Sequence, residues 1–171
     1  MRYNYCPKCG NKLIAKQAGD DGDVPFCQEC QEYWFDSFAS CVIVLVYNEF
    51  QEVVLSRQGY ISNTYASFTS GFMSPGETAE ETAVREVKEE IGLDVQNLEY
   101  AGTYWFGARE QLLHGFIAYS PKRELSLSQE VDDAKWISVL DAPKYMFPES
   151  PGNAAYGIYR KYLKKIQISN K

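Results

Sequence analysis

The residues that most clearly suggest chemistry are three glutamates near the end of a predicted helix. Glu86, Glu89 and Glu90 are spaced i, i+3 and i+4, which places their side chains on one helix face. Carboxylates at the C-terminal end oppose the helix dipole by roughly a few tenths of a kcal/mol each. A hard divalent cation, which prefers oxygen ligands, would offset that repulsion. The alternative is a solvated acidic face, and the spacing alone leaves both interpretations open.

A second set of candidate ligands consists of cysteines near the N-terminus. Cys6 and Cys9 form one Cys-x-x-Cys pair, and Cys27 and Cys30 form another. Two such pairs at this separation are typical of a site in which four thiolates hold one Zn²⁺. Metal binding would also supply the folding free energy that so short a polar segment lacks. We predict a structural zinc ribbon; redox or incidental cysteines are the alternative.

The elements that must position these residues are strands interrupted by two helices. Apolar residues recur at every fourth position from Ala79 to Ile91, and Gly92 suits a C-terminal cap. This order is typical of an α/β or α+β domain with a mixed sheet. We expect a zinc ribbon over residues 1–36 and a main domain over residues 37–171. The expected strands are 38–47, 52–58, 65–72, 98–106, 112–120 and 134–139, and the expected helices are 78–91 and 153–166.

Composition limits the classes of function. A chain of 171 residues with 45% hydrophobic content can build one core and a small attachment. The formal net charge of −6 argues against a general nucleic-acid or membrane-surface binder. No apolar run is long enough for a membrane span, and the start, MRYNYCPK, lacks the apolar segment of a signal peptide. We therefore expect a cytoplasmic protein with no membrane partner.

The glutamates belong to a longer pattern, G-x5-E-x7-R-E-V-K-E-E-I-G-L, which runs from Gly71 to Leu93. Every fixed position matches the Nudix box, G-x5-E-x7-REUxEExGU, in which U is an apolar residue. The chain therefore resembles the Nudix hydrolases. The resemblance implies the Nudix fold, a mixed sheet sandwiched between helices. It also implies Mg²⁺- or Mn²⁺-dependent cleavage of a nucleoside diphosphate linked to another group, X.

The resemblance also implies roles for the residues of the box. Glu86, Glu89 and Glu90 would be the metal ligands and catalytic residues, and one of them, or a nearby loop glutamate, would accept the proton from water. We expect Glu77 and Arg85 to hold the loop against the helix. The supporting residues of the box are Gly71, Glu77, Arg85 and Gly92.

A zinc ribbon directly before a Nudix domain resembles the NADH pyrophosphatase (NAD diphosphatase) group. The segment EVDDAKW (130–136) resembles a family segment whose acidic residue would be a further metal ligand, here Glu130. A solvated loop acid is the alternative, with Asp132 and Asp133 as competing candidates. Aromatic residues that could stack on a base or nicotinamide ring, or instead pack in the core, are Phe35, Phe72 and Trp105.

One segment departs from the group's pattern. NADH-cleaving members carry S-Q-P-W-P-F-P-x-S after the box, whereas TYWFGAREQ (103–111) keeps aromatics but no proline. We expect hydrolysis of NAD(H), or a related dinucleotide, to AMP and a second mononucleotide; ADP-ribose, FAD or a nucleotide sugar are alternatives. A noncatalytic nucleotide sensor is the alternative from another class. Apart from the nucleotide we expect a homodimer, and no nucleic acid other than NAD-capped RNA.

Overall fold

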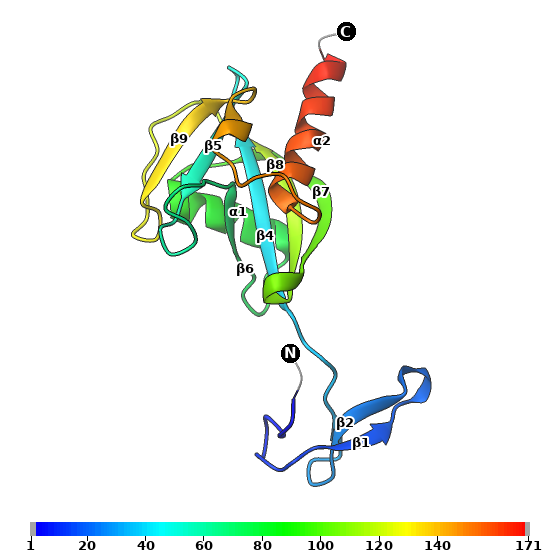
Figure 1. The fold of residues 1–171 in the computed structure, drawn as a ribbon. Helices are drawn as coiled ribbons and strands as arrows, with labels where there is room; N and C mark the ends of the chain where they lie inside the picture. The colour runs from blue at the N-terminus through cyan, green and yellow to red at the C-terminus, as the bar shows by residue number, and fades with distance from the viewer. Residues whose placement is uncertain (1–2, 170–171) are drawn as a thin grey trace. The chain divides into compact units, whose positions relative to one another are not determined.

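The computed structural model describes residues 3–169 and divides into two compact units, the first ending at Phe38 and the second starting at Ala39 (Figure 1). The first unit is a three-stranded antiparallel sheet in the order β1-β2-β3. Its small core is aromatic: the rings of Phe26 and Tyr33 lie 4.8 Å apart, and the Lys16 ammonium lies 3.7 Å from the Phe26 ring centre. Its elements are β1 (Ile14–Gln17), η1 (Gly19–Asp21), β2 (Asp23–Cys27) and β3 (Glu32–Tyr33).

The second unit is built on a six-stranded mixed sheet in the order β7-β8-β4-β5-β9, with β6 also paired to β4. The pair β4–β8 is parallel and the other pairs are antiparallel. Its elements are β4 (Ala39–Tyr47), β5 (Glu52–Arg57), β6 (Thr69–Phe72), α1 (Ala79–Ile91), β7 (Gln96–Phe106), η2 (Gly107–Arg109), β8 (Gln111–Tyr119), β9 (Asp133–Ser138), η3 (Ala142–Lys144) and α2 (Ala154–Ser169).

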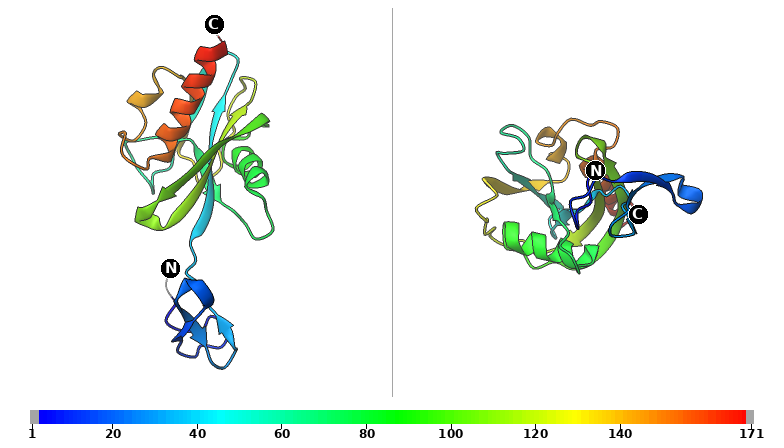
Figure 2. Two further views of the ribbon diagram at one scale, coloured as in Figure 1. Left: turned by 90° about the vertical axis from the view of Figure 1, so that its right-hand side faces the viewer. Right: turned by 90° about the horizontal axis from the view of Figure 1, so that it is seen from below.

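The two helices of this unit cover opposite faces of its sheet (Figure 2, left). The sequence of β4 explains this arrangement, because its apolar side chains point alternately to the two faces of the sheet. Val42, Val44 and Val46 join the core beneath α1, whereas Ile43 and Leu45 join the core beneath α2. A strand buried on both faces needs a continuous apolar run, as β4 has. The predicted fold, a mixed sheet between helices, is confirmed.

Helix α1 has well-defined ends. Thr78 accepts a hydrogen bond from the backbone of Glu81, whose side chain bonds back to the Thr78 amide, so the two residues form a capping box. At the other end Gly92 adopts a left-handed conformation, with φ of 75°, and its N–H bonds to the Lys88 carbonyl. These caps fix the turns that carry the three glutamates. The predicted helix, 78–91, agrees with α1 except that Thr78 is its N-cap rather than its first residue.

The other predicted elements agree with the structure within about two residues at most ends, with one clear exception. The predicted strand 65–72 is a strand only from Thr69 to Phe72. Before it, Ser67 exchanges backbone hydrogen bonds with Ser56, and Ala66 forms an isolated bridge with Met146. No helix among residues 3–169 is long and apolar enough to cross a membrane.

Candidate active site and metal sites

The loop before α1 is tied to the helix by an ion pair. Arg85 Nε and Nη2 donate to the two carboxylate oxygens of Glu77, at 2.6 and 2.9 Å. Glu77 Oε2 also accepts from the Ser74 amide and the Thr82 hydroxyl, each at 3.0 Å. The bond from Arg85, followed by that from Ser74, lowers the pKa of Glu77 to about 2. A carboxylate so fully engaged suits the supporting role predicted for this pair.

The same guanidinium also reaches two of the predicted metal ligands. Arg85 Nη1 donates to Glu86 Oε1 at 2.8 Å and to Glu89 Oε2 at 2.9 Å. The Glu89 side chain is 60% exposed, whereas the Glu86 side chain is largely buried. Arg85 therefore places a positive charge between two carboxylates that would otherwise repel each other.

Glu90 is the buried member of the set, with only 4% of its surface exposed. Its Oε1 accepts from the Gln58 side-chain amide at 2.7 Å, while Oε2 is buried with no hydrogen-bond partner in the described part of the chain. Burial, and then the nearby Glu86, raise the pKa of Glu90 to about 7. A buried carboxylate oxygen without a partner is costly, and a cation would satisfy it. The residues present therefore fit a divalent metal.

Gly71, the first residue of the box, allows β6 to pass directly against Glu86. A Cβ atom at this position would lie 2.0 Å from the Glu86 carboxyl carbon, far inside van der Waals contact. Any other residue would have to displace the carboxylate. The glycine of the motif is thus explained by packing against Glu86 rather than by a turn.

A cavity of about 1100 Å³ opens beside these residues, which is room enough for a dinucleotide-sized ligand. Glu86, Glu90 and Glu130 line it, whereas Glu89 is not among its lining residues. The predicted aromatics Phe72 and Trp105 also line it and are exposed. Phe35 belongs to the first unit, beside Tyr33, and its contact with substrate stays a prediction.

Further lining residues were not predicted as substrate contacts from the sequence. They include Gln58, Tyr60, Phe106 and Phe147. Aromatic residues are frequent in this chain, so only their convergence on one cavity distinguishes these from core residues. The segments that bring them there are far apart in sequence.

The structure separates the three acidic candidates of the 130–136 segment. Asp132 Oδ2 accepts a hydrogen bond from the Gly59 amide, and Asp133 forms an ion pair with Lys135 at 2.9 Å. Glu130 lines the cavity with Glu86 and Glu90. Its placement suits an additional ligand better than that of either aspartate, and the role itself stays a prediction.

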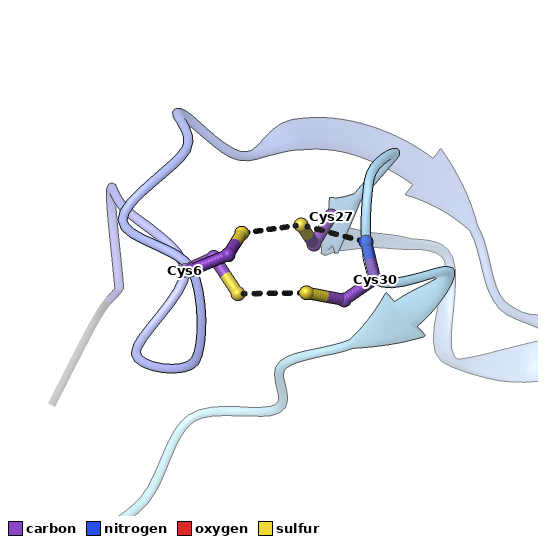
Figure 3. Close-up of side chains that lie close together, drawn as sticks. Cys6, Cys27 and Cys30 are labelled. Atoms are coloured by element: carbon purple, nitrogen blue, oxygen red, sulfur yellow. Dashed lines mark hydrogen bonds between the residues drawn. The ribbon is translucent and has the colours of Figure 1, made fainter.

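The four N-terminal cysteines form a compact cluster, and Figure 3, in which Cys6, Cys27 and Cys30 are labelled, shows their side chains pointing toward one another. The four sulfur atoms all lie within 4.8 Å of one another; Cys6 and Cys30 are 3.9 Å apart, and Cys9 and Cys27 are 3.5 Å apart. A tetrahedral site with Zn–S bonds of about 2.3 Å requires sulfur separations of about 3.8 Å. The donor set and its spacing therefore fit Zn²⁺.

The opposite pKa shifts of two of these thiols also favour a cation. Although burial opposes it, the backbone amides of Cys9 and Lys8 lower the pKa of Cys6 to about 7. The pKa of Cys30 is raised well above its ordinary value by the Cys9 thiol first, and by burial. Without a metal, four thiolates at these distances would repel one another. A divalent cation would offset that repulsion.

The fold and the site define the class of protein. Residues 37–156 match the NUDIX domain, and the chain belongs to the Nudix hydrolase family. It is 35% identical over 144 residues to the NAD-capped RNA hydrolase NudC of Pseudomonas aeruginosa (strain LESB58), covering 82% of this chain and 50% of that protein. The NudC protein of Pseudomonas fluorescens (strain Pf-5) is 30% identical over 156 residues, covering 90% and 54%. The chain spans about half the length of these curated relatives.

Solved structures show the same fold. A NUDIX hydrolase from Nitrosomonas europaea matches with a TM-score of 0.77 and 19% identity, over 95% of this chain and 92% of that one. The NUDIX domain of Shewanella oneidensis NrtR, in a complex with ADP ribose, matches with a TM-score of 0.63 and 16% identity, over 82% and 94%. At these identities the likeness concerns the fold alone.

Proposed function

We propose that this protein hydrolyses the diphosphate linkage of a nucleoside diphosphate linked to X in a metal-dependent reaction. The observation that supports it most directly is Glu90, a buried carboxylate with one unpaired oxygen beside a large cavity. Two further carboxylates, Glu86 and Glu130, line the same cavity. Such a concentration of negative charge would repel a diphosphate unless cations were bound there.

The residues that would hold Mg²⁺ or Mn²⁺ are Glu86, Glu90 and Glu130, together with Glu89, which shares the helix face of Glu86 and Glu90. When bound, the cation would neutralise charge on the diphosphate oxygens and lower the pKa of a water molecule. One of these glutamates would accept the proton of the attacking water. Arg85 and Glu77 would hold the helix and its preceding loop in place.

The proposed substrate is NAD(H) or a related dinucleotide, cleaved to AMP and a second mononucleotide. The similarity to proteins named NAD-capped RNA hydrolase supports this choice. Phe72 and Trp105 would stack on the flat rings of such a substrate, and Arg109, which also lines the cavity, would pair with a phosphate. ADP-ribose, FAD, a nucleotide sugar and the NAD cap of RNA present the same diphosphate.

For the first unit we propose a structural role. Its four cysteines would hold one Zn²⁺, because their sulfur separations match a tetrahedral site. The homodimer and the cytoplasmic location stay predictions. A nucleotide sensor without catalysis would use the same cavity but would show no turnover.

The test is AMP release from NADH with Mg²⁺ or Mn²⁺, identified by mass spectrometry. The Glu90→Gln variant should lose activity by about a hundredfold or more. The matched control is Glu80→Gln, an exposed position on the same helix, which should keep full activity. Cleavage of ADP-ribose or FAD but not NADH would change the substrate only. No turnover of any of these nucleotides would overturn the enzymatic proposal, and an active Glu90→Gln variant would overturn the placement of the site.

A further inference from the structure

The residue that follows β5 provides the hydrogen bond to Glu90. Gln58 is 8% exposed, and its side-chain Nε2 donates to Glu90 Oε1 at 2.7 Å. The Tyr60 hydroxyl donates to Gln58 Oε1 at 3.1 Å. Both ends of the Gln58 amide are therefore used, one by a buried carboxylate and the other by a phenol at the cavity.

The direction of this chain of hydrogen bonds follows from the chemistry of its members. An ionised carboxylate only accepts, so Glu90 requires the NH₂ end of the amide. The Tyr60 hydroxyl, by donating to the oxygen end, favours the same orientation. As a result Glu90 Oε1 is held by the protein, and Oε2 is the oxygen left without a partner in the described residues.

The backbone around Gln58 is held as firmly as its side chain. The Gln58 carbonyl accepts from the amides of Ile61 and Ser62, at 2.9 and 3.0 Å. The next amide, that of Gly59, donates to Asp132 Oδ2. A Cβ on Gly59 would lie 2.7 Å from that oxygen, so the glycine permits the contact. A side chain projecting from so restrained a segment has little freedom to move away from Glu90.

We propose that Gln58 is a positioning residue: its amide fixes Glu90 Oε1 so that Oε2 is presented to a divalent cation, and Tyr60 sets the orientation of that amide. The inference rests on the proposed metal-dependent function. The competing explanation is that Gln58 only satisfies a buried polar group. The two differ in what they predict for metal affinity in a protein that remains folded.

Replacing Gln58 by methionine keeps the length of the side chain and removes the donor. Glu90 Oε1 would then lose its side-chain donor and the orientation that this donor imposes. Residues that orient metal ligands typically contribute about 10- to 100-fold to metal affinity. We expect Gln58→Met to weaken Mn²⁺ binding by that factor. Tyr60→Phe, which removes only the orienting hydroxyl, should weaken it by about two- to tenfold.

The experiment is a Mn²⁺ titration of the zinc-loaded full chain, with free Mn²⁺ measured by electron paramagnetic resonance. Wild type is compared with Gln58→Met, Tyr60→Phe and Glu90→Gln. The matched control is Gln96→Met, an exposed position on β7, whose affinity should equal that of wild type. The helical circular dichroism of each variant without Mn²⁺ shows that it is folded.

The outcomes separate this inference from the proposed function. If Glu90→Gln weakens Mn²⁺ binding while folded Gln58→Met and Tyr60→Phe bind as wild type does, the positioning role is overturned and the metal site stands. If wild type binds no Mn²⁺, or Glu90→Gln has no effect, the proposed site itself fails. Should Gln58→Met not fold, Tyr60→Phe, at a residue that is 70% exposed, decides the question.

Discussion

Replacing Glu90 by glutamine should abolish the pH dependence that this buried carboxyl gives to the stability of the metal-free second unit. The pKa of Glu90 is about 7 in the folded protein, against an ordinary value of 4.5. Holding the ionised carboxylate in the folded protein therefore costs about 3 kcal/mol. Glutamine cannot ionise and so has no such penalty.

The sign follows from proton linkage. Well below pH 4.5 the carboxyl is protonated in both states, so its ionisation adds no penalty. Between pH 4.5 and 7 the unfolded chain releases its proton first, so the free energy of unfolding falls as the pH rises. Above pH 7 the full penalty of about 3 kcal/mol is present. The amide that Glu90→Gln introduces would carry its own burial cost, of about 1–3 kcal/mol if unpaired, but that cost does not change with pH.

The measurement therefore compares the change in the free energy of unfolding with pH between wild type and the variant. Urea unfolding of wild type and Glu90→Gln is compared at pH 5 and pH 8 in buffer freed of divalent cations by a chelating resin, so that the cysteine site keeps its metal. The helical circular dichroism reports the second unit alone, because α1 and α2 both belong to it. We expect wild type to lose about 2–3 kcal/mol more than the variant between these pH values. Glu80→Gln is the control and should behave as wild type.

Parallel pH profiles for wild type and Glu90→Gln would refute the reasoning, since they would show that Glu90 is not ionised at a cost in the folded state. A second check uses Mg²⁺. Because the cation binds the carboxylate form, saturating Mg²⁺ should stabilise wild type at pH 8 much more than it stabilises the variant.

Three further predictions concern other parts of the site. Glu77 has a lowered pKa of about 2, so its ion pair with Arg85 should stabilise the fold fully above pH 4.5 and progressively less as the pH falls toward 2; acid unfolding of Glu77→Gln should lack this contribution. Gly71→Ala should displace the Glu86 carboxyl and weaken Mn²⁺ binding by at least about tenfold, with helical content unchanged; titration with Mn²⁺ would show it. Cys27→Ser should reduce bound zinc from one equivalent to a small fraction, measured by elemental analysis, while the helical signal of the second unit stays that of wild type.

Much of the second unit is predictable because its signals are local. Apolar residues at every fourth position, followed by Gly92, indicate α1. The continuous apolar run of β4 indicates a strand that is buried on both faces, so alternation of apolar with polar residues is not needed to recognise it. The predicted strand 65–72 is too long, since at Ser67 the chain keeps an extended form but bonds to β5 rather than continuing in β6. In the first unit the sequence predicts no strand, because polar segments such as Ile14–Gln17 carry little apolar pattern.

The site is predictable only as far as the motif extends. The spacing places the glutamates on one helix face, but it cannot show that Glu89 is exposed while Glu90 is buried. That difference depends on which side of α1 meets the sheet. Gln58 lies 32 positions from Glu90, and nothing in its local sequence indicates the contact. Tertiary packing at the end of β5 creates it.

The guanidinium of Arg85, lying between Glu86 and Glu89 while anchored on Glu77, acts as an internal counter-ion. We therefore expect the second unit to stay folded without Mg²⁺, so that a shortage of that ion would lower turnover rather than stability. The four clustered thiols of the first unit would instead depend on the Zn²⁺ proposed for them. If zinc is scarce, we expect proteases to cleave the chain within the first unit. The two metals would thus control different properties of one chain, its turnover and its lifetime.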